Sequence, residues 1–182
     1  HARLAAGQRV LITGAAGGVG HFGVQIAKHL GAHVVAVCGA GNADFVRGLG
    51  ADEVVDSARD DFTQRDDRFH VVFDAASVSS FLAARRVLGE EGCYLNTSGN
   101  MAGVASTAVG AVIARLTARQ RAVPLALKAG AATWQRLAQL AAAGALRPHV
   151  ERTIALEEVA EAQRAMETGH GRGKVVVRIE PA

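Results

Sequence analysis

The sequence predicts an α/β fold, namely a doubly wound parallel sheet of about six strands (the Rossmann architecture) with a C-terminal helix-strand tail. Three observations predict it: short apolar runs alternate with helical patterns, those runs are continuously apolar, and a glycine-rich turn follows the first of them. Continuously apolar strands are typical of parallel sheets with helices on both faces. At 182 residues, 49% of them hydrophobic, the chain suits one globular domain with a substantial core.

The glycine-rich turn predicts a dinucleotide site. Near its start the chain reads VLITGAAGGVG, an apolar β-branched run that ends in the turn, and a helical pattern follows. Ala15, Gly17 and Gly20 have the spacing that gives a tight bend, room for a pyrophosphate and close helix-to-strand packing. The unpaired N–H groups at the helix start favour an anion. Gly18, Gly20 and Gly23 also fit the literal G-x-G-x-x-G string, but that match starts too far beyond the strand and is interpreted as coincidental.

Strands and helices alternate along the rest of the chain. Hydrophobic periodicity and stop signals such as Gly31 and Gly144 define them. The expected strands are 9–13, 33–38, 53–56, 69–75, 92–97 and 122–127, and the expected helices are 18–30, 42–49, 80–88, 108–119 and 133–143. The dinucleotide is expected across the carboxyl ends of the strands, where the strand order switches.

The tail differs from this core. Residues 146–154 suggest an extended connector, 157–167 a helix and 174–179 a last strand, with glycines between the last two. A lone helix and strand after a complete sheet suggest an element that packs against something further. We therefore divide the chain into a dinucleotide-binding domain (6–145) and a tail (146–182).

Composition argues against several partners. The 20 basic and 17 acidic side chains give a net charge of +3, and they are scattered, so no nucleic-acid partner is expected despite a pI near 9.3. The start lacks an apolar signal-peptide core, and the uncharged stretch 94–114 is rich in Asn, Ser and Gly, so no membrane span is expected.

Cysteine and histidine usage predicts no metal. Cys38 and Cys93 are isolated thiols in apparent strands, which we interpret as reduced core residues, and this favours the cytoplasm. The seven histidines are dispersed and lack zinc-ligand spacing.

The turn alone also fits short-chain dehydrogenases. Those enzymes need a Tyr-x-x-x-Lys pair on a later helix for proton transfer. Here the single tyrosine, Tyr94, lies in a predicted strand, and the residue four positions on is Ser98. The sequence therefore argues against that family.

Several segments together resemble another family. ITGAAGGVG, VQIAKHLGAHVVAVC, LGADEVVD, the strand at 71–76 and LEEVAEAQRAMETGHGRGKVVVRI occur in the order found in the cofactor domain of the medium-chain dehydrogenase/reductase superfamily, in its zinc-free quinone-oxidoreductase-like branch. The resemblance covers nearly all of the chain. It implies hydride transfer from NADPH to a quinone or an α,β-unsaturated carbonyl.

The resemblance also implies a missing partner. In the family, an N-terminal catalytic domain of roughly 100 residues precedes this segment, and the last helix and strand rejoin it. Two hypotheses follow: the chain is the cofactor domain of such an enzyme, inactive without that domain, or it is a stand-alone, non-catalytic NAD(P)-binding or sensing module.

By family position, three groups of small residues would contact the cofactor. No catalytic residue is expected among them, because hydride transfer needs little beyond positioning of the cofactor. Ala16, Gly17, Gly18 and Val19 would meet the pyrophosphate, Gly39 and Asn42 the adenosine ribose, and Ala75, Ala76, Thr97, Ser98 and Gly99 the nicotinamide side.

Cofactor choice depends on the loop after the second strand. An NAD-specific turn has an acid there, whereas this loop reads CGAGN and has none, which favours NADP(H) and leaves NAD(H) possible. The family's serine and arginine are replaced by Gly39 and Gly41. Arg47 either reaches back to this loop or is an ordinary exposed helical arginine.

The sixth strand predicts a homodimer. An apolar strand at a sheet edge invites pairing with another chain, and dimers of the resembling family join their sheets through this strand. Pro124 is tolerated mainly at edges, so it favours the edge placement but leaves continuous pairing open.

Overall fold

The described strands form a parallel six-stranded sheet and a separate parallel pair. A computed structural model describes residues 2–97, 110, 112, 119–124, 130–167 and 171–179. The large sheet has the order β3-β2-β1-β4-β5-β6, which switches direction between β1 and β4, and β7 pairs with β8. The strands are β1 (Arg9–Thr13), β2 (His33–Cys38), β3 (Glu53–Asp56), β4 (Phe69–Asp74), β5 (Leu88–Asn96), β6 (Arg121–Pro124), β7 (Val150–Ala155) and β8 (Lys174–Arg178). The predicted Rossmann fold is confirmed.

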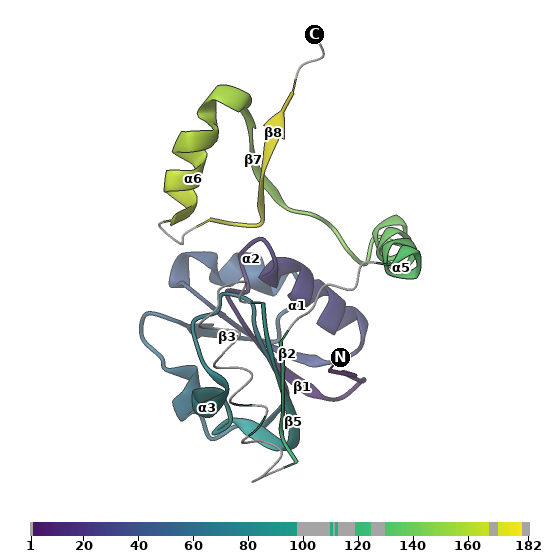
Figure 1. Ribbon diagram of the computed structural model, residues 1–182, viewed down its shortest axis with the longest axis vertical. Coiled ribbons are helices and arrows are strands. Elements are labelled where there is room, and N and C mark those ends of the chain that lie inside the picture. Colours follow the sequence, from purple (N-terminus) through teal and green to yellow (C-terminus); the bar gives the residue numbers. More distant parts are fainter. Residues whose placement is uncertain are drawn as a thin grey trace.

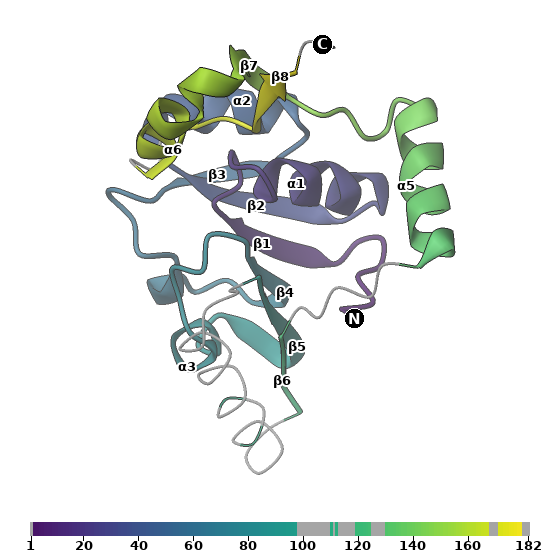
Figure 2. The same ribbon diagram turned by 45° about the horizontal axis from the view of Figure 1, so that its top comes forward.

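Helices lie on both faces of the large sheet. α1 and α2 lie on one face and α3 on the other (Figures 1 and 2). The helices are α1 (Gly20–His29), α2 (Ala43–Gly48), α3 (Phe81–Ala84), α5 (Ala131–Ala142) and α6 (Val159–Glu167), with 3-10 turns at Ala40–Asn42, Phe62–Gln64 and Leu156–Glu158.

The alternation of side chains along β1 explains why its sequence is continuously apolar. Leu11 packs into the cluster beneath α3, whereas Val10 and Ile12 pack into the cluster beneath α1, and all three are at most 2% exposed. Successive side chains of a strand point to opposite faces, so a strand covered on both sides has no polar face. Cys38 and Cys93 are buried and form no disulfide, as predicted.

The largest boundary difference lies between β4 and β5. The helix expected at 80–88 is only the four-residue α3, because β5 already begins at Leu88, which pairs with Phe69. The register then shifts before Val71 pairs with Cys93. The strand expected at 92–97 is therefore longer at its start. Most of the helix expected at 108–119, and residues 125–127 of the sixth strand, lie outside the described residues.

The tail contains a strand that the sequence did not predict. The expected connector 146–154 ends in β7, which pairs in parallel with β8. The two-stranded sheet and α6 lie beside α2, whereas α5 stands at the outer side of the large sheet (Figures 1 and 2). Val150, Val176 and Val177 are 36% or more exposed, so the small sheet presents apolar side chains.

Candidate cofactor site

The turn after β1 is built on glycines that the backbone geometry requires. Gly14 has φ +57°, a conformation that other residues rarely adopt. The amide of Gly17 donates to the carbonyl of Gly14 at 2.9 Å and closes the turn. A Cβ at Gly20 would lie 2.1 Å from the same carbonyl oxygen. Gly14 and Gly20 therefore shape the turn itself.

Helix α1 starts directly from this turn and lacks a side-chain cap. Val19 is the N-cap residue and makes no capping hydrogen bond through its side chain. The first N–H groups of a helix have no carbonyl partner within it, so they can donate to an anion. The close packing of α1 on the sheet involves Gly23 as well, since a Cβ there would lie 2.9 Å from the ring of Phe73. Gly23 thus has a role in packing α1 on the sheet.

A cavity of about 530 Å³ opens at this turn, at the carboxyl ends of β1, β2 and β4. Of the eleven residues that the sequence analysis assigned to the cofactor, eight line it, whereas Thr97 does not, and Ser98 and Gly99 lie outside the described residues. The lining residues are Thr13, Gly14, Ala16, Gly17, Gly18, Val19, Gly20, Val37, Cys38, Gly39, Asn42, Ser57, Ala75, Ala76, Val78, Gly171 and Lys174. Whether these residues bind a cofactor stays a prediction.

The cavity and its glycines fit a dinucleotide. Gly17 and Gly18 face the cavity, and a Cβ on Gly17 would meet only the Gly14 carbonyl, at 3.3 Å. Gly39 has open space around its missing Cβ. These positions leave room for a ligand to approach the backbone, which a pyrophosphate on a helix N-terminus requires.

A buried carboxylate joins the strands next to the cavity through hydrogen bonds. Asp74, at the end of β4, is fully buried and accepts from the hydroxyls of Thr13 at 2.5 Å and Tyr94 at 2.8 Å. It also accepts from the amides of Val78 and Ser79. Burial, followed by the hydrogen bond to Asp74, raises the pKa of the Tyr94 hydroxyl, so this phenol stays a donor. The network joins β1, β4 and β5.

The residues predicted for the nicotinamide side lie next to the hydrogen-bond network of Asp74. Ala75 and Ala76 follow Asp74 and line the cavity. Thr97 donates its hydroxyl to the carbonyl of Ala75 at 3.1 Å, and its amide is 3.4 Å from the carbonyl of Asp74. The side chain of Thr97 thus holds the chain after β4 rather than facing the cavity.

The loop after β2 has no acidic residue on the cavity wall. Burial raises the pKa of the Cys38 thiol, and neighbouring Asp56 raises it further, so this cysteine lines the cavity as a neutral group. Arg47 donates to Asp44 at 2.9 Å and does not line the cavity. The structure therefore favours the interpretation of Arg47 as an exposed helical arginine.

The tail is held against the cofactor turn by side chains of α1. Gln25 accepts from the amide of Arg147 at 2.7 Å and donates to its carbonyl at 3.0 Å. His21 is fully buried, with Nδ1 2.8 Å from the carbonyl oxygen of Gly17 and Nε2 3.5 Å from the amide of His149. Because a carbonyl only accepts, Nδ1 is the protonated nitrogen and Nε2 accepts. Burial lowers the pKa of His21, consistent with this neutral form.

Sequence reasoning missed the contributions of the tail and of Asp74. Lys174 and Gly171 line the cavity, although they follow the turn by more than 150 positions. Both residues belong to the GRGK sequence, which lies in one of the segments that resemble the family. That resemblance is the sequence signal that could have identified them. Asp74 ends a largely apolar strand, and a charged residue at such a strand end is also visible in the sequence.

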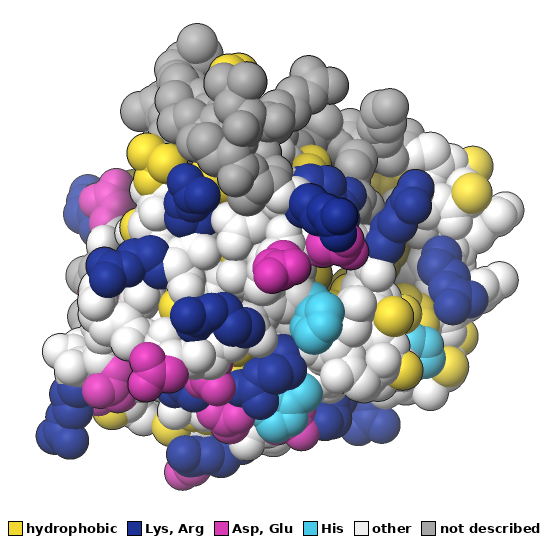
Figure 3. Space-filling view, turned by 90° about the horizontal axis from the view of Figure 1, so that it is seen from below, with side chains coloured by type: hydrophobic (Ala, Val, Ile, Leu, Met, Phe, Trp, Pro, Cys, Tyr) yellow, Lys and Arg dark blue, Asp and Glu magenta, His cyan; other side chains and the backbone are white. Residues whose placement is uncertain are grey.

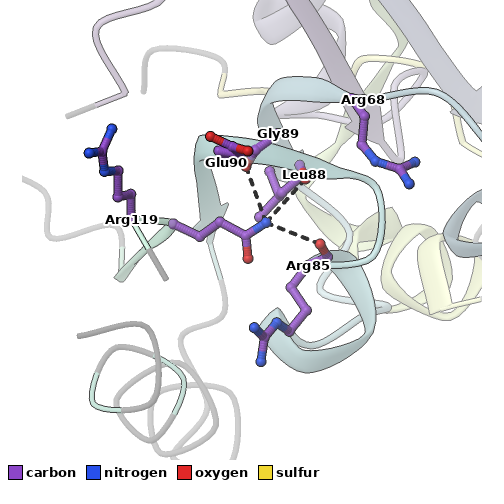
Figure 4. Close-up of a pocket in the computed structure, with 7 residues that line it drawn as sticks. Arg68, Arg85, Leu88, Gly89, Glu90 and Arg119 are labelled. Carbon is purple, nitrogen blue, oxygen red and sulfur yellow. Dashed lines mark hydrogen bonds between the residues drawn. The ribbon is translucent and has the colours of Figure 1, made fainter. Parts of the chain in front are cut away.

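A second cavity lies at the opposite end of the sheet. Its volume is about 590 Å³, and it is lined by residues at or just before the amino ends of β4, β5 and β6. Gln120 fills part of it and donates to three backbone carbonyls, those of Arg85, Leu88 and Gly89 (Figure 4). The guanidinium groups of Arg68 and Arg119 point in different directions. Parallel sheets of this kind bind dinucleotides at the carboxyl ends of their strands, and this cavity lies at the amino ends, so it is not the candidate site.

Charge and metal-ligand patterns give no second candidate. On the face in Figure 3, Lys and Arg side chains are interspersed with Asp, Glu and His. Within the described ranges, no three His, Cys, Asp or Glu side chains are grouped as metal ligands. None of the helices described is both long enough and apolar enough to cross a membrane.

Comparison with known proteins decides the family. The family model described as "Zinc-binding dehydrogenase" matches residues 49–177, most of the chain. The chain belongs to this family. Within the medium-chain dehydrogenase/reductase superfamily, it falls in the quinone-oxidoreductase-like branch, as its similarity to known members shows.

The similar proteins are oxidoreductases that are longer than this chain. The chain is 34% identical to the mitochondrial NAD(P)H oxidoreductase RTN4IP1 of Mus musculus, over 95% of this chain and 48% of that protein. It is 30% identical to the chloroplast envelope quinone oxidoreductase homolog of Arabidopsis thaliana, over 92% of this chain and 51% of that protein. The quinone oxidoreductase of Coxiella burnetii has a similar structure, with a TM-score of 0.86 and 27% identity, over 98% of this chain and 55% of that one. The chain thus spans about half the length of these curated relatives.

Proposed function

We propose that the chain is the cofactor-binding part of an NAD(P)H-dependent oxidoreductase that transfers hydride to a quinone or an α,β-unsaturated carbonyl. The observation that carries this proposal is the cavity of about 530 Å³ at the carboxyl ends of β1, β2 and β4, with the glycine turn and the uncapped N-terminus of α1 in its wall. The names of the similar proteins, an NAD(P)H oxidoreductase and a quinone oxidoreductase homolog, support it.

In this proposal the small residues bind and orient the cofactor. A bound nicotinamide supplies the hydride. Ionisable groups on the described cavity wall are limited to the Cys38 thiol and the Lys174 amine, so groups that bind the substrate come from elsewhere in the protein. Ala16, Gly17, Gly18 and Val19 bind the pyrophosphate, Gly39 and Asn42 the adenosine ribose, and Ala75 and Ala76 border the nicotinamide. Ser98 and Gly99 are proposed for the nicotinamide side as well, whereas Thr97 supports that side by donating to the carbonyl of Ala75.

The division into 6–145 and 146–182 belongs to the same proposal. The tail joins a substrate domain that the relatives' greater length accommodates. The exposed valines of β7 and β8 support this, because exposed apolar side chains on a small sheet favour a packing partner. The intact mass of the native polypeptide distinguishes this arrangement from a stand-alone dinucleotide-binding module.

Four finer features complete the proposal. The loop after β2 has no acid, which supports NADP(H), with NAD(H) as a weaker ligand. The scattered His and Cys residues support a mechanism without zinc, and the unpaired buried thiols support a cytoplasmic location. The edge position of β6 supports a homodimer with a second copy of the chain.

The Gly17→Val variant tests the cofactor site. A valine there projects into the cavity, while its Cβ meets only one backbone oxygen at 3.3 Å, so NADPH affinity should fall more than about tenfold, or 1.4 kcal/mol, with the fold retained. Calorimetric titration of NADPH measures the loss. Gly48→Val is the matched control, since a Cβ at Gly48 meets nothing within 4 Å and lies away from the cavity. Equal NADPH affinity in wild type and Gly17→Val would make the site assignment wrong.

A further inference from the structure

The segment 171–174 of the tail forms one wall of the candidate cofactor cavity. The amide of Gly173 donates to the carbonyl of Ala16 at 2.8 Å, which joins this segment directly to the glycine turn. Gly171 and Lys174 line the cavity. A Cβ built on Gly18 would lie 3.0 Å from Nζ of Lys174, so this ammonium lies beside the part of the turn assigned to the pyrophosphate.

Arg172 extends from the same segment to the loop after β2. Its Nε donates to Oδ1 of Asn42 at 2.6 Å, and its Nη2 donates to the carbonyl of Gly41 at 2.5 Å. This loop is where an NADP-specific fold has a basic residue near the ribose 2′-phosphate, and the loop itself has none. The basic group therefore arrives from a segment 130 positions away in the sequence.

The two cations are available for an anion. Within the part of the chain that the structure describes, the recorded ion pairs include neither Arg172 nor Lys174. Glu151 accepts from the backbone amide of Arg172, not from its guanidinium. A guanidinium has five N–H donors, and two are used here, so the remainder can bind a phosphate with two parallel hydrogen bonds.

We propose that Arg172 binds the 2′-phosphate of NADP(H) and that Lys174 binds the pyrophosphate, so that the tail determines, through Arg172, the preference for the phosphorylated cofactor. This inference rests on the proposed function, because it places the same cofactor in the same cavity. It assigns the selectivity to the tail instead of to the loop after β2. It also makes the tail part of the cofactor site, since bound NADP(H) would contact both the glycine turn and segment 171–174.

The test compares ligands that differ only in the 2′-phosphate. Binding of NADPH, NADH, 2′,5′-ADP and 5′-AMP is measured by calorimetry on wild type, Arg172→Gln, Arg172→Lys and Lys174→Gln. Arg172→Gln should weaken NADPH and 2′,5′-ADP about tenfold or more, as expected for a charged hydrogen bond, and leave NADH and 5′-AMP within about twofold. Arg172→Lys should restore part of the loss. Lys174→Gln should weaken NADPH and NADH alike.

Arg164→Gln is the control, because Arg164 is exposed on α6 and its loss removes the same charge outside the cavity. An equal loss of NADPH and NADH in Arg172→Gln would assign Arg172 a purely structural role and overturn the inference, and so would unchanged binding of both. If wild type binds neither cofactor, the proposed function itself fails. Should Arg172→Gln unfold, salt titration of the wild type decides: 2′,5′-ADP must lose affinity with salt more steeply than 5′-AMP does.

Discussion

At the scale of single residues, the glycines of the cofactor turn divide into two groups. Gly14 and Gly20 are required by the backbone itself, through a positive φ and a contact that no Cβ could make. Gly39 has no such constraint, and a Cβ at Gly17 would meet only the Gly14 carbonyl oxygen, at 3.3 Å, so the small size of these two residues matters for what occupies the cavity. The sequence pattern predicted the turn, but glycines of both groups look identical in a sequence because the distinction depends on three-dimensional neighbours.

Gly39 offers a test of cofactor selectivity at this scale. Its φ of −66° and the open space around its missing Cβ accept a side chain, so Gly39→Asp should fold normally. The new carboxylate would repel a 2′-phosphate and accept from a ribose hydroxyl, so NADPH should bind about tenfold more weakly and NADH more tightly.

Competitive titration of NADPH and NADH on both proteins measures the shift, and Gly39→Asn, which adds similar volume without charge, is the control. A wild type that clearly prefers NADH would contradict the NADPH assignment. A Gly39→Asp variant with an unchanged cofactor ratio would place the ribose elsewhere.

At the scale of elements, hydrophobic periodicity predicted most strands but misjudged those defined by distant partners. Leu88 joins β5 because it pairs with Phe69, and Val150 joins β7 because it pairs with Lys174. Neither segment has a distinctive local pattern, since β strands gain their stability from neighbouring strands. The buried Asp74 was also invisible to periodicity, because its partners come from two other strands and a following turn.

The Asp74 network should be a major contribution to the stability of the sheet. Asp74→Asn replaces an acceptor-only group with one that also has N–H donors facing the donors of Thr13, Tyr94 and two amides. We expect a loss of roughly 1–3 kcal/mol in the free energy of unfolding. Urea unfolding measures it, and Tyr94→Phe, which removes one donor, should cost less. An Asp74→Asn variant as stable as wild type would contradict this account.

The edge strand β6 gives a prediction about assembly. β6 is the last strand of the described six-stranded sheet, as the sequence predicted, and Val123 is partly buried against the core. If two copies pair along β6, Val123→Lys should shift a homodimer towards monomer at micromolar concentration in sedimentation experiments. Val123→Thr controls for lost packing, and thermal unfolding checks that both variants fold. A wild type that is monomeric throughout would refute the dimer, and a dimer unaffected by the lysine would place the interface elsewhere.

At the scale of the whole molecule, the sequence predicted the sheet better than it predicted how the tail is attached. The fold class followed from the alternation of strands and helices, and such a sheet allows few arrangements. The attachment depends on polar contacts such as the one between Gln25 and Arg147, which are 122 positions apart. Hydrogen bonds of this kind leave no periodic signal. A further contact of this kind, from the amide of Gly173 to the carbonyl of Ala16, joins the segment of Lys174 to the turn, which is why the site was only partly predictable.

His21 connects the turn, α1 and the tail, and it makes the stability of this arrangement dependent on pH. Burial lowers the pKa of His21 below the ordinary value near 6.5. The imidazole is therefore neutral in the folded chain, and its Nε2 accepts from the amide of His149. The unfolded chain then binds a proton that the folded chain does not, so stability should fall as pH drops below about 6.5, by at most about 1.4 kcal/mol per pH unit, until the folded pKa is reached.

Urea unfolding at pH 7.5 and 5.5 measures this difference. His21→Asn should reduce the pH dependence, since its amide can donate to Gly17 without titrating, whereas the exposed His29→Gln should leave it unchanged. The pH range in which His21 acts differs from that of the carboxylates. Hydrogen bonds from His33 to Glu53, and from Lys28 and Val34 to Asp52, lower the pKa of these two acids. Their contribution to stability is therefore lost only at more acidic pH. A wild type and a His21→Asn variant with the same slope between pH 7.5 and 5.5 would show that His21 does not cause the pH dependence of stability.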